Sequence, residues 1–123
     1  MKNFWEYDRY SLACLEDMLL SHGWESDKSN YPEYYRVYKN GYMLLSVNYD
    51  MRDGDVTGLY LNDTRYLNDS RCVMTTNNTP KDKNRYLGTG LSIGNAVRIV
   101  LGDMANVRAM VSNAVIEQAL DAL

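Results

Sequence analysis

Cysteine, proline and histidine are scarce in this sequence: its 123 residues include two cysteines, two prolines and one histidine. Two cysteines are too few for a disulfide scaffold or a cysteine-based zinc site. We therefore expect Cys14 and Cys72 to be buried free thiols in a reducing cytosol. The single histidine, and the lack of a serine or cysteine in a nucleophile motif, argue against a catalytic triad.

Long apolar runs are also missing. No stretch approaches the roughly 20 apolar residues that a helix needs to span a bilayer. The N-terminal residues MKNFWEYDRY contain acidic side chains and no apolar central region, so we expect no signal peptide. Both absences favour a cytoplasmic protein that has no membrane partner.

An excess of charge of either sign is absent as well, because 13 basic and 16 acidic residues leave a net charge of -3. Direct binding to nucleic acid needs a basic stripe that contacts phosphates, which this sequence does not show. A DNA mimic needs a dense field of carboxylates. We therefore expect no direct nucleic-acid binding.

What the sequence does contain is 46% apolar and 24% charged residues, a balance typical of one folded domain over residues 1–123. It also contains eleven tyrosines against one phenylalanine, and twelve asparagines. We associate this composition with small accessory proteins of phages and mobile elements.

Helical periodicity occurs at both ends of the chain. Apolar residues recur at helical spacing over residues 8–22, with Asp8 as a candidate N-cap and Gly23 as the stop. The last third has two apolar stripes at helical spacing, with a predicted break near Ala105 and Asn106. The stripes are Ile93, Val97, Val100, Leu101 and Met104, then Val107, Met110, Val111, Ala114 and Val115.

The middle of the chain has the pattern of strands. Residues 34–49, YYRVYKNGYMLLSVNY, predict a hairpin with a type I′ turn at Asn40-Gly41, and alternating apolar residues after it predict one dry face. Two more strands are expected near residues 56–61 and 71–75, whereas the segment after Trp24 is too charged for the core. The sequence therefore predicts an α+β fold: an N-terminal helix, an antiparallel sheet of about four strands and two C-terminal helices.

A six-residue phrase occurs twice in succession, as YLNDTR at residues 60–65 and YLNDSR at residues 66–71. Asn-Asp followed by a hydroxyl residue is typical of turns, so the repeat predicts two successive turns after the third strand. The alternative is a contact surface for a protein partner on one exposed edge. Its charged members would be Asp63, Arg65, Asp69 and Arg71.

Tyrosines are concentrated in the hairpin. Strand alternation gives it two faces, Tyr34, Arg36 and Tyr38 on one and Tyr35, Val37 and Lys39 on the other. Tyrosine and arginine are enriched at binding hot spots, so a face turned to solvent is expected to bind a partner. The residues predicted to do so are Tyr34, Arg36, Tyr38 and Tyr42. Cross-strand aromatic pairing is the alternative role.

Three aspartates lie close together in YDMRDGD, at residues 49–55. The spacing of Asp50, Asp53 and Asp55 differs from that of a calcium loop, which needs D-x-D-x-D-G and a distal glutamate. We therefore expect a solvated turn and no metal ion.

The segment RYLGTG, at residues 85–90, resembles the R-x-x-G-x-G phosphate loop of acetyltransferases of the GNAT superfamily, and an apolar helix follows it here as in that family. The resemblance implies that Arg85, Gly88 and Gly90 line a site for acetyl-CoA, whose pyrophosphate is held by loop amides and a helix N-terminus. The alternative is a plain junction between a loop and a helix.

These observations favour a small acidic protein-interaction module without enzymatic activity or a cofactor. The expected role is that of an inhibitor or immunity-type protein, encoded by a phage or mobile element and acting on a host macromolecule, such as an anti-restriction or anti-CRISPR factor. The alternative is a truncated GNAT-like acetyltransferase that binds acetyl-CoA at residues 85–90.

Overall fold

The computed structural model describes residues 9–64, 72–78, 87–102 and 104–121, and the side chains of the last helix over 105–113. Its elements are α1 (Leu12–Ser21), β1 (Glu25–Asp27), β2 (Tyr35–Asn40), β3 (Met43–Tyr49), β4 (Val56–Asp63), β5 (Cys72–Thr75), α2 (Ile93–Leu101) and α3 (Met104–Asp121). The predicted α+β fold is confirmed: one helix, an antiparallel sheet and then two helices. The sheet has five strands where about four were predicted.

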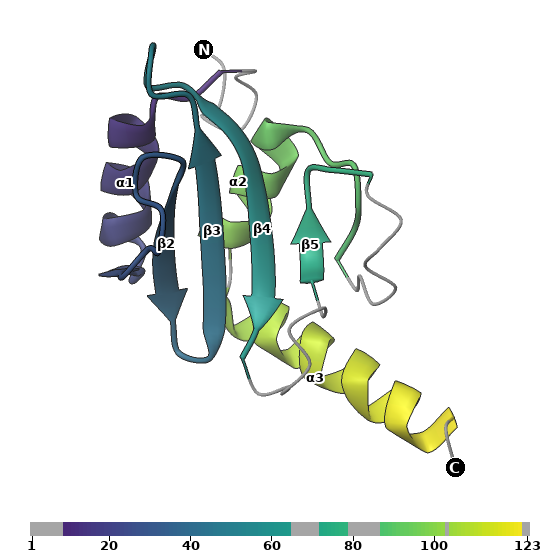
Figure 1. Ribbon diagram of the computed structural model, residues 1–123. Helices are drawn as coiled ribbons and strands as arrows, with labels where there is room; N and C mark the ends of the chain where they lie inside the picture. The colour runs from purple at the N-terminus through teal and green to yellow at the C-terminus, as the bar shows by residue number, and fades with distance from the viewer. Residues whose placement is uncertain (1–8, 65–71, 79–86, 103, 122–123) are drawn as a thin grey trace, which may run out of the picture.

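The sheet is a meander in which each strand pairs with the next along the chain, in the order β1-β2-β3-β4-β5. All four pairings are antiparallel, and the β3–β4 pairing holds the longest register, from Met43 opposite Asp63 to Tyr49 opposite Val56. Figure 1 shows α1 and α2 behind the sheet, while α3 runs away from it toward the C-terminus. The front of the sheet carries no helix among the described residues.

One face of the sheet forms the core with the helices. Its buried side chains alternate along the strands, as predicted for β3, and are joined by residues of α1, α2 and α3. From the sheet they are Tyr38, Met43, Leu45, Val47, Leu59, Leu61 and Met74, and from the helices Leu15, Leu19, Val97, Val100, Val107 and Val111. The opposite face, which we call the open face, carries Tyr35, Ser46, Asn48, Tyr60 and Asn62.

Trp24 precedes the segment that was expected to stay out of the core, and is itself buried. Its side chain is 2% exposed, and its indole Nε1 donates a hydrogen bond of 3.0 Å to the carbonyl oxygen of Val100 in α2. Helix C-terminal carbonyls have no partner within the helix, so the indole satisfies one of them. The exposed residues 25–27 that follow form β1, which pairs with β2 at the edge of the sheet.

The β2–β3 turn is shifted by one residue from its predicted place. Asn40 pairs with Met43, so the two-residue loop consists of Gly41 and Tyr42. Gly41 has a φ of +63°. Every positive φ among the described residues belongs to a glycine, so the φ of Tyr42 is negative. A positive φ at the first loop position alone matches a type II′ turn rather than the type I′ turn that the Asn-Gly pair predicted.

The helices also differ from their predicted limits. Ser11 caps α1, and its side chain accepts a hydrogen bond from the amide of Cys14, whereas the predicted cap at Asp8 lies outside the described residues. The break between the last two helices follows Leu101, with Gly102 as the C-cap of α2, instead of lying near Ala105. Within α3, Met110 is 56% exposed and does not join the core.

Cys72 is buried as expected, whereas Cys14 is exposed on α1 and contradicts its prediction. None of the helices in the described part of the chain combines the length and the apolar character that a membrane crossing requires.

Candidate functional site

The hairpin residues predicted to bind a partner do not share one exposed face. Tyr34 is 66% exposed and Arg36 is exposed, but Tyr38 is 1% exposed, so its predicted exposure is wrong. Tyr38 pairs with Leu45 and therefore lies on the face that the helices cover. Tyr42 is half-buried, with the guanidinium carbon of Arg108 5.7 Å from its ring centroid.

Arg36 stays in solvent although it belongs to the same face as Tyr38. It lies near the start of β2, opposite Val47, and its guanidinium carbon is 5.9 Å from the ring centroid of Tyr49. A cation over an aromatic ring is held electrostatically at such a distance, which gives Arg36 a preferred position beside the tyrosines of this end of the sheet.

The repeated phrase begins inside the sheet. Residues 60–63 of its first copy belong to β4, so the predicted turn is wrong for that copy. Asp63 is 3% exposed, and its expected place on an exposed edge is wrong, because it pairs with Met43 on the core face. Arg65, Asp69 and Arg71 lie outside the described residues.

Around the predicted phosphate loop, Gly88 and Gly90 have φ of +136° and +65°, and Arg85 lies outside the described residues. The amides of Gly90 and Leu91 donate to the carbonyls of Asn77 and Thr75, at 3.2 and 3.3 Å. Ser92 caps α2 through a bond from the amide of Asn95. In this conformation these two amides bind the end of β5 and the residues after it, and so are not directed at an anion.

Residues 29–35, which we call the tyrosine turn, present the most exposed aromatic rings on the hairpin side of the molecule. Tyr31 and Tyr34 are 58% and 66% exposed. The amides of Tyr34 and Tyr35 both donate to the carbonyl of Tyr31, at 2.9 and 3.1 Å, and the hydroxyl of Ser29 donates to the carbonyl of Tyr35 at 2.7 Å. The backbone under the two exposed rings is therefore fixed by its own hydrogen bonds.

The tyrosine turn is also tied to β3. The Tyr49 hydroxyl donates to the carbonyl of Pro32 at 2.5 Å, and the Tyr49 amide donates to the carbonyl of Tyr34 at 3.1 Å. On the other side, the rings of Tyr31 and Tyr35 lie with centroids 6.4 Å apart and planes tilted by 54°. Through Tyr35, the turn is continuous with the open face of the sheet.

A shallow recess of about 260 Å³ lies on the open face. We call it the recess, and it is lined by Tyr35, Ser46, Asn48, Tyr60 and Asn62. These come from three adjacent strands, because Tyr35 is opposite Asn48 and Ser46 is opposite Tyr60. The hydroxyl of Tyr60 accepts a hydrogen bond from Asn77, which holds its ring at the border of the recess.

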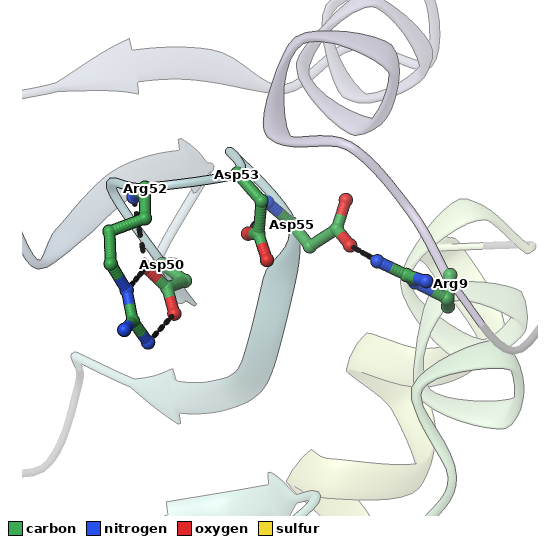
Figure 2. A network of polar contacts seen from close by, with 5 residues as sticks. All are labelled: Arg9, Asp50, Arg52, Asp53 and Asp55. Atoms are coloured by element: carbon green, nitrogen blue, oxygen red, sulfur yellow. Dashed lines mark hydrogen bonds and ion pairs between the residues drawn. The ribbon is translucent and has the colours of Figure 1, made fainter.

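The aspartate-rich loop between β3 and β4 contains two ion pairs (Figure 2). Arg52 donates to Asp50 from Nε at 3.2 Å and from a terminal nitrogen at 2.9 Å. These bonds, and one from the Arg52 amide, lower the pKa of Asp50 to about 2. Arg9 donates to Asp55 on the other side of the loop, and this partner raises the pKa of the arginine.

The same loop therefore joins the start of the chain to the sheet. The amides of Leu12 and Val56 donate to the carbonyls of Gly54 and Tyr10, each at 2.8 Å. No group of three or more histidine, cysteine, aspartate or glutamate side chains in the described ranges is arranged to hold a metal ion. The aspartates act here as turn and ion-pair residues.

A second hollow, of about 430 Å³, lies between α2 and the first turns of α3. Its lining is mostly apolar, with one cation: Leu87, Arg98, Ile99, Gly102, Asn106, Val107 and Met110. Within the described residues its lining contains no acid, base or nucleophile pair.

Comparison with known proteins adds no relative: no family model, no curated protein and no solved structure matches the chain.

Sequence reasoning missed the recess and part of the tyrosine turn. Asn48 stands on β3 and Tyr60 and Asn62 stand on β4, and only the sheet register brings them together. The available signal was the period-two alternation of β3 and β4, which places Ser46 between Leu45 and Val47, and Tyr60 between Leu59 and Leu61. Tyr31 precedes a proline in a polar segment, where nothing in the sequence indicates that a turn presents its ring.

Proposed function

We propose that this chain is a small acidic protein-interaction module without enzymatic activity, which docks on a partner protein through the tyrosine turn and the adjoining open face of the sheet. The observation that supports this most is the exposure of Tyr31 and Tyr34 at 58% and 66% on a backbone that is already hydrogen-bonded. Large rings held in water on a fixed turn do little for folding and lose little backbone freedom on binding.

The chemistry of the turn suits a protein partner. Tyrosine offers a large contact area with only two side-chain torsions to restrict, and its hydroxyl can remain hydrogen-bonded at the border of an interface. Arg36 adds a guanidinium next to Tyr49. Tyrosine and arginine are two of the residue types that dominate binding energy in measured interfaces.

The particular role we propose is that of an inhibitor or immunity-type protein that acts in the cytoplasm on a host macromolecule, in the manner of an anti-restriction or anti-CRISPR factor of a phage or mobile element. Its support is the small size, the net charge of -3 and the tyrosine-rich surface. A protein target fits better than nucleic acid, because no basic stripe accompanies the tyrosines.

The experiment is affinity capture from host lysates with the full chain and three single variants. Tyr31→Ala and Tyr34→Ala remove the exposed rings, while Leu20→Ala removes a 47% exposed side chain from α1 as the matched control. A partner retained by the wild type and by Leu20→Ala, and lost or weakened at least tenfold by the tyrosine variants, supports the proposal. Capture that neither Tyr31→Ala nor Tyr34→Ala weakens contradicts the proposal.

Acetyl-CoA provides a separate test of the alternative activity. A ligand that binds only the folded state raises the melting temperature, by an amount that grows with its concentration over the dissociation constant. We expect no shift at millimolar acetyl-CoA, because the amides of Gly90 and Leu91 already have partners. A shift of several degrees would favour the acetyltransferase over the interaction module.

A further inference from the structure

The recess brings together polar side chains that have no hydrogen-bond partner within the described residues. Ser46, Asn48 and Asn62 make no side-chain hydrogen bond to any residue that the structure describes. All three are half-buried on the open face. Half-buried amides and hydroxyls normally find a partner in the protein or in ordered water. Their convergence therefore leaves several donors and acceptors directed at whatever occupies the recess.

The described residues that line the recess carry no charge. They supply two amides, one hydroxyl and two phenols, and the charged residues on the described part of the open face, Glu25, Asp27 and Lys39, lie on β1 and the far end of β2. A charged group in the recess would give up part of its water and meet no counter-charge among the described lining residues. The lining therefore favours a neutral occupant.

The occupant must also both donate and accept. A carboxamide supplies one acceptor oxygen and two N–H donors, and so do the side chains of Asn48 and Asn62. Amide groups can therefore pair with one another in the recess, with the Ser46 hydroxyl as a further donor or acceptor. An apolar occupant would cover these groups and leave them unpaired.

The size of the recess favours part of a larger partner. At about 260 Å³ it is smaller than the roughly 300–1,000 Å³ of sites that enclose a free small molecule. It adjoins the tyrosine turn through Tyr35, whose ring contacts Tyr31. A polypeptide that covers Tyr31 can therefore continue over Tyr35 to the recess.

We propose that the recess receives an uncharged amide of the partner polypeptide, an asparagine or glutamine side chain, between Tyr35 and Tyr60. This inference rests on the proposed function, because it assumes a protein partner. It adds the chemistry of recognition: the tyrosine turn supplies contact area, and the recess selects a neutral segment with hydrogen-bonding side chains over a charged one.

The test is an NMR titration of the full chain, labelled with ¹⁵N, with three probes. They are N-acetyl-asparagine N-methylamide, its aspartate analogue at neutral pH and methyl glucoside. We expect the asparagine probe to shift the side-chain amide signals of Asn48 and Asn62 with a dissociation constant on the order of 1–10 mM. The aspartate probe should bind at least fivefold more weakly.

Two variants locate the binding. Asn62→Ala should weaken the asparagine probe at least threefold, whereas Asn95→Ala, which removes an exposed amide from α2, should leave it unchanged. The comparison of probes uses the unaltered chain, so it tests the preference for a neutral amide even if Asn62→Ala does not fold. Equal shifts with the aspartate probe, shifts with methyl glucoside alone, or no shift with any probe would overturn the inference.

The outcome is separable from that of the proposed function. Partner capture that depends on Tyr34 but not on Asn62 would keep the interaction module and discard the amide-binding recess. The reverse outcome is that the recess binds the asparagine probe while partner capture does not depend on Tyr31 or Tyr34. It would keep the amide-binding recess and discard docking through the tyrosine turn.

Discussion

The guanidinium of Arg108, on α3, donates a hydrogen bond to Oδ1 of Asn40, at the end of β2, although the two residues are 68 positions apart in the chain. The same guanidinium lies over the ring of Tyr42 and against Gly41. The hairpin turn is therefore held by a helix from the other end of the chain. A turn that two adjacent residues predict is thus also stabilised by a contact between distant parts of the chain.

This contact predicts the effect of an added methyl group at Gly41. A Cβ there would lie 3.0 Å from a terminal nitrogen of Arg108, and the φ of +63° is unfavourable for any L side chain. Gly54, with φ +74° and nothing within 4 Å of its Cβ, is the matched control. Gly54→Ala should lower the free energy of unfolding by about 1–2 kcal/mol, and Gly41→Ala by more.

The additional loss of unfolding free energy in Gly41→Ala, relative to Gly54→Ala, should disappear when Arg108 is also changed to Ala, since only the backbone strain then remains. Urea denaturation of Gly41→Ala, Gly54→Ala, Arg108→Ala and the double variant at Gly41 and Arg108 measures this coupling. Equal losses for Gly41→Ala and Gly54→Ala in the wild-type background would show that the guanidinium moves aside without penalty.

The buried Tyr38 predicts how the free energy of unfolding changes at alkaline pH. Burial, and then the nearby carboxylate of Glu16, raise its pKa to about 12 from the usual 10, and its buried hydroxyl has no hydrogen-bond partner among the described residues. The folded state disfavours the phenolate, so the contribution of this residue to stability is complete below pH 10 and is lost as the pH rises toward 12.

Tyr38→Phe should therefore raise the free energy of unfolding at pH 7 by up to about 1 kcal/mol, because it removes an unpaired buried polar atom. The advantage should increase above pH 10. Urea denaturation at pH 7 and at pH 10.5 measures both values. A variant that is less stable than the wild type at pH 7 would mean that the hydroxyl has a stabilising partner.

The Arg52–Asp50 pair predicts a local effect at low pH. Asp50 has a pKa of about 2, below its usual value near 4, so its ionised form is favoured in the folded state. The contribution of the pair is present above about pH 4 and is lost as the pH falls toward 2. Arg52→Ala should return the Asp50 pKa toward its usual value, as followed by carboxyl NMR.

The matched control for this prediction is Arg98→Ala, which removes a cation from the hollow between α2 and α3. It should leave the Asp50 titration unchanged. If both arginine variants moved the Asp50 pKa equally, general charge and not the direct hydrogen bonds would be responsible.

The hydrogen bond from Trp24 to Val100 joins the residue before the edge strand β1 to α2, and its contribution to stability can be measured. Trp24→Phe keeps an aromatic ring in the core but removes the indole N–H, which leaves the carbonyl of Val100 without that donor. The lost bond and the smaller ring should together lower the free energy of unfolding by about 1–4 kcal/mol. Thermal or urea unfolding tests it, and a change below about 0.5 kcal/mol would contradict the importance of the bond.

The sequence by itself determined the local elements whose signal is periodic. The alternation of Met43, Leu45 and Val47 predicted a strand with one dry face, and the spacing of Val97, Val100 and Leu101 predicted a buried helix stripe; both are confirmed. Such patterns depend only on the geometry of strand and helix, so they can be read before any contact is known.

The tertiary structure decided which side of each element is covered. Tyr34 and Tyr38 belong to the same face of the predicted hairpin, yet Tyr34 is exposed because it precedes β2, and Tyr38 is buried because it joins the core that the sheet forms with the helices. Asp63 was expected on a surface and lies in the core, while the connection after Trp24 supplied an unpredicted strand. Strand register alone assembled the recess from three separate strands. Local periodicity carries no information on which strands pair or which face the helices cover, because these depend on contacts between residues far apart in the chain.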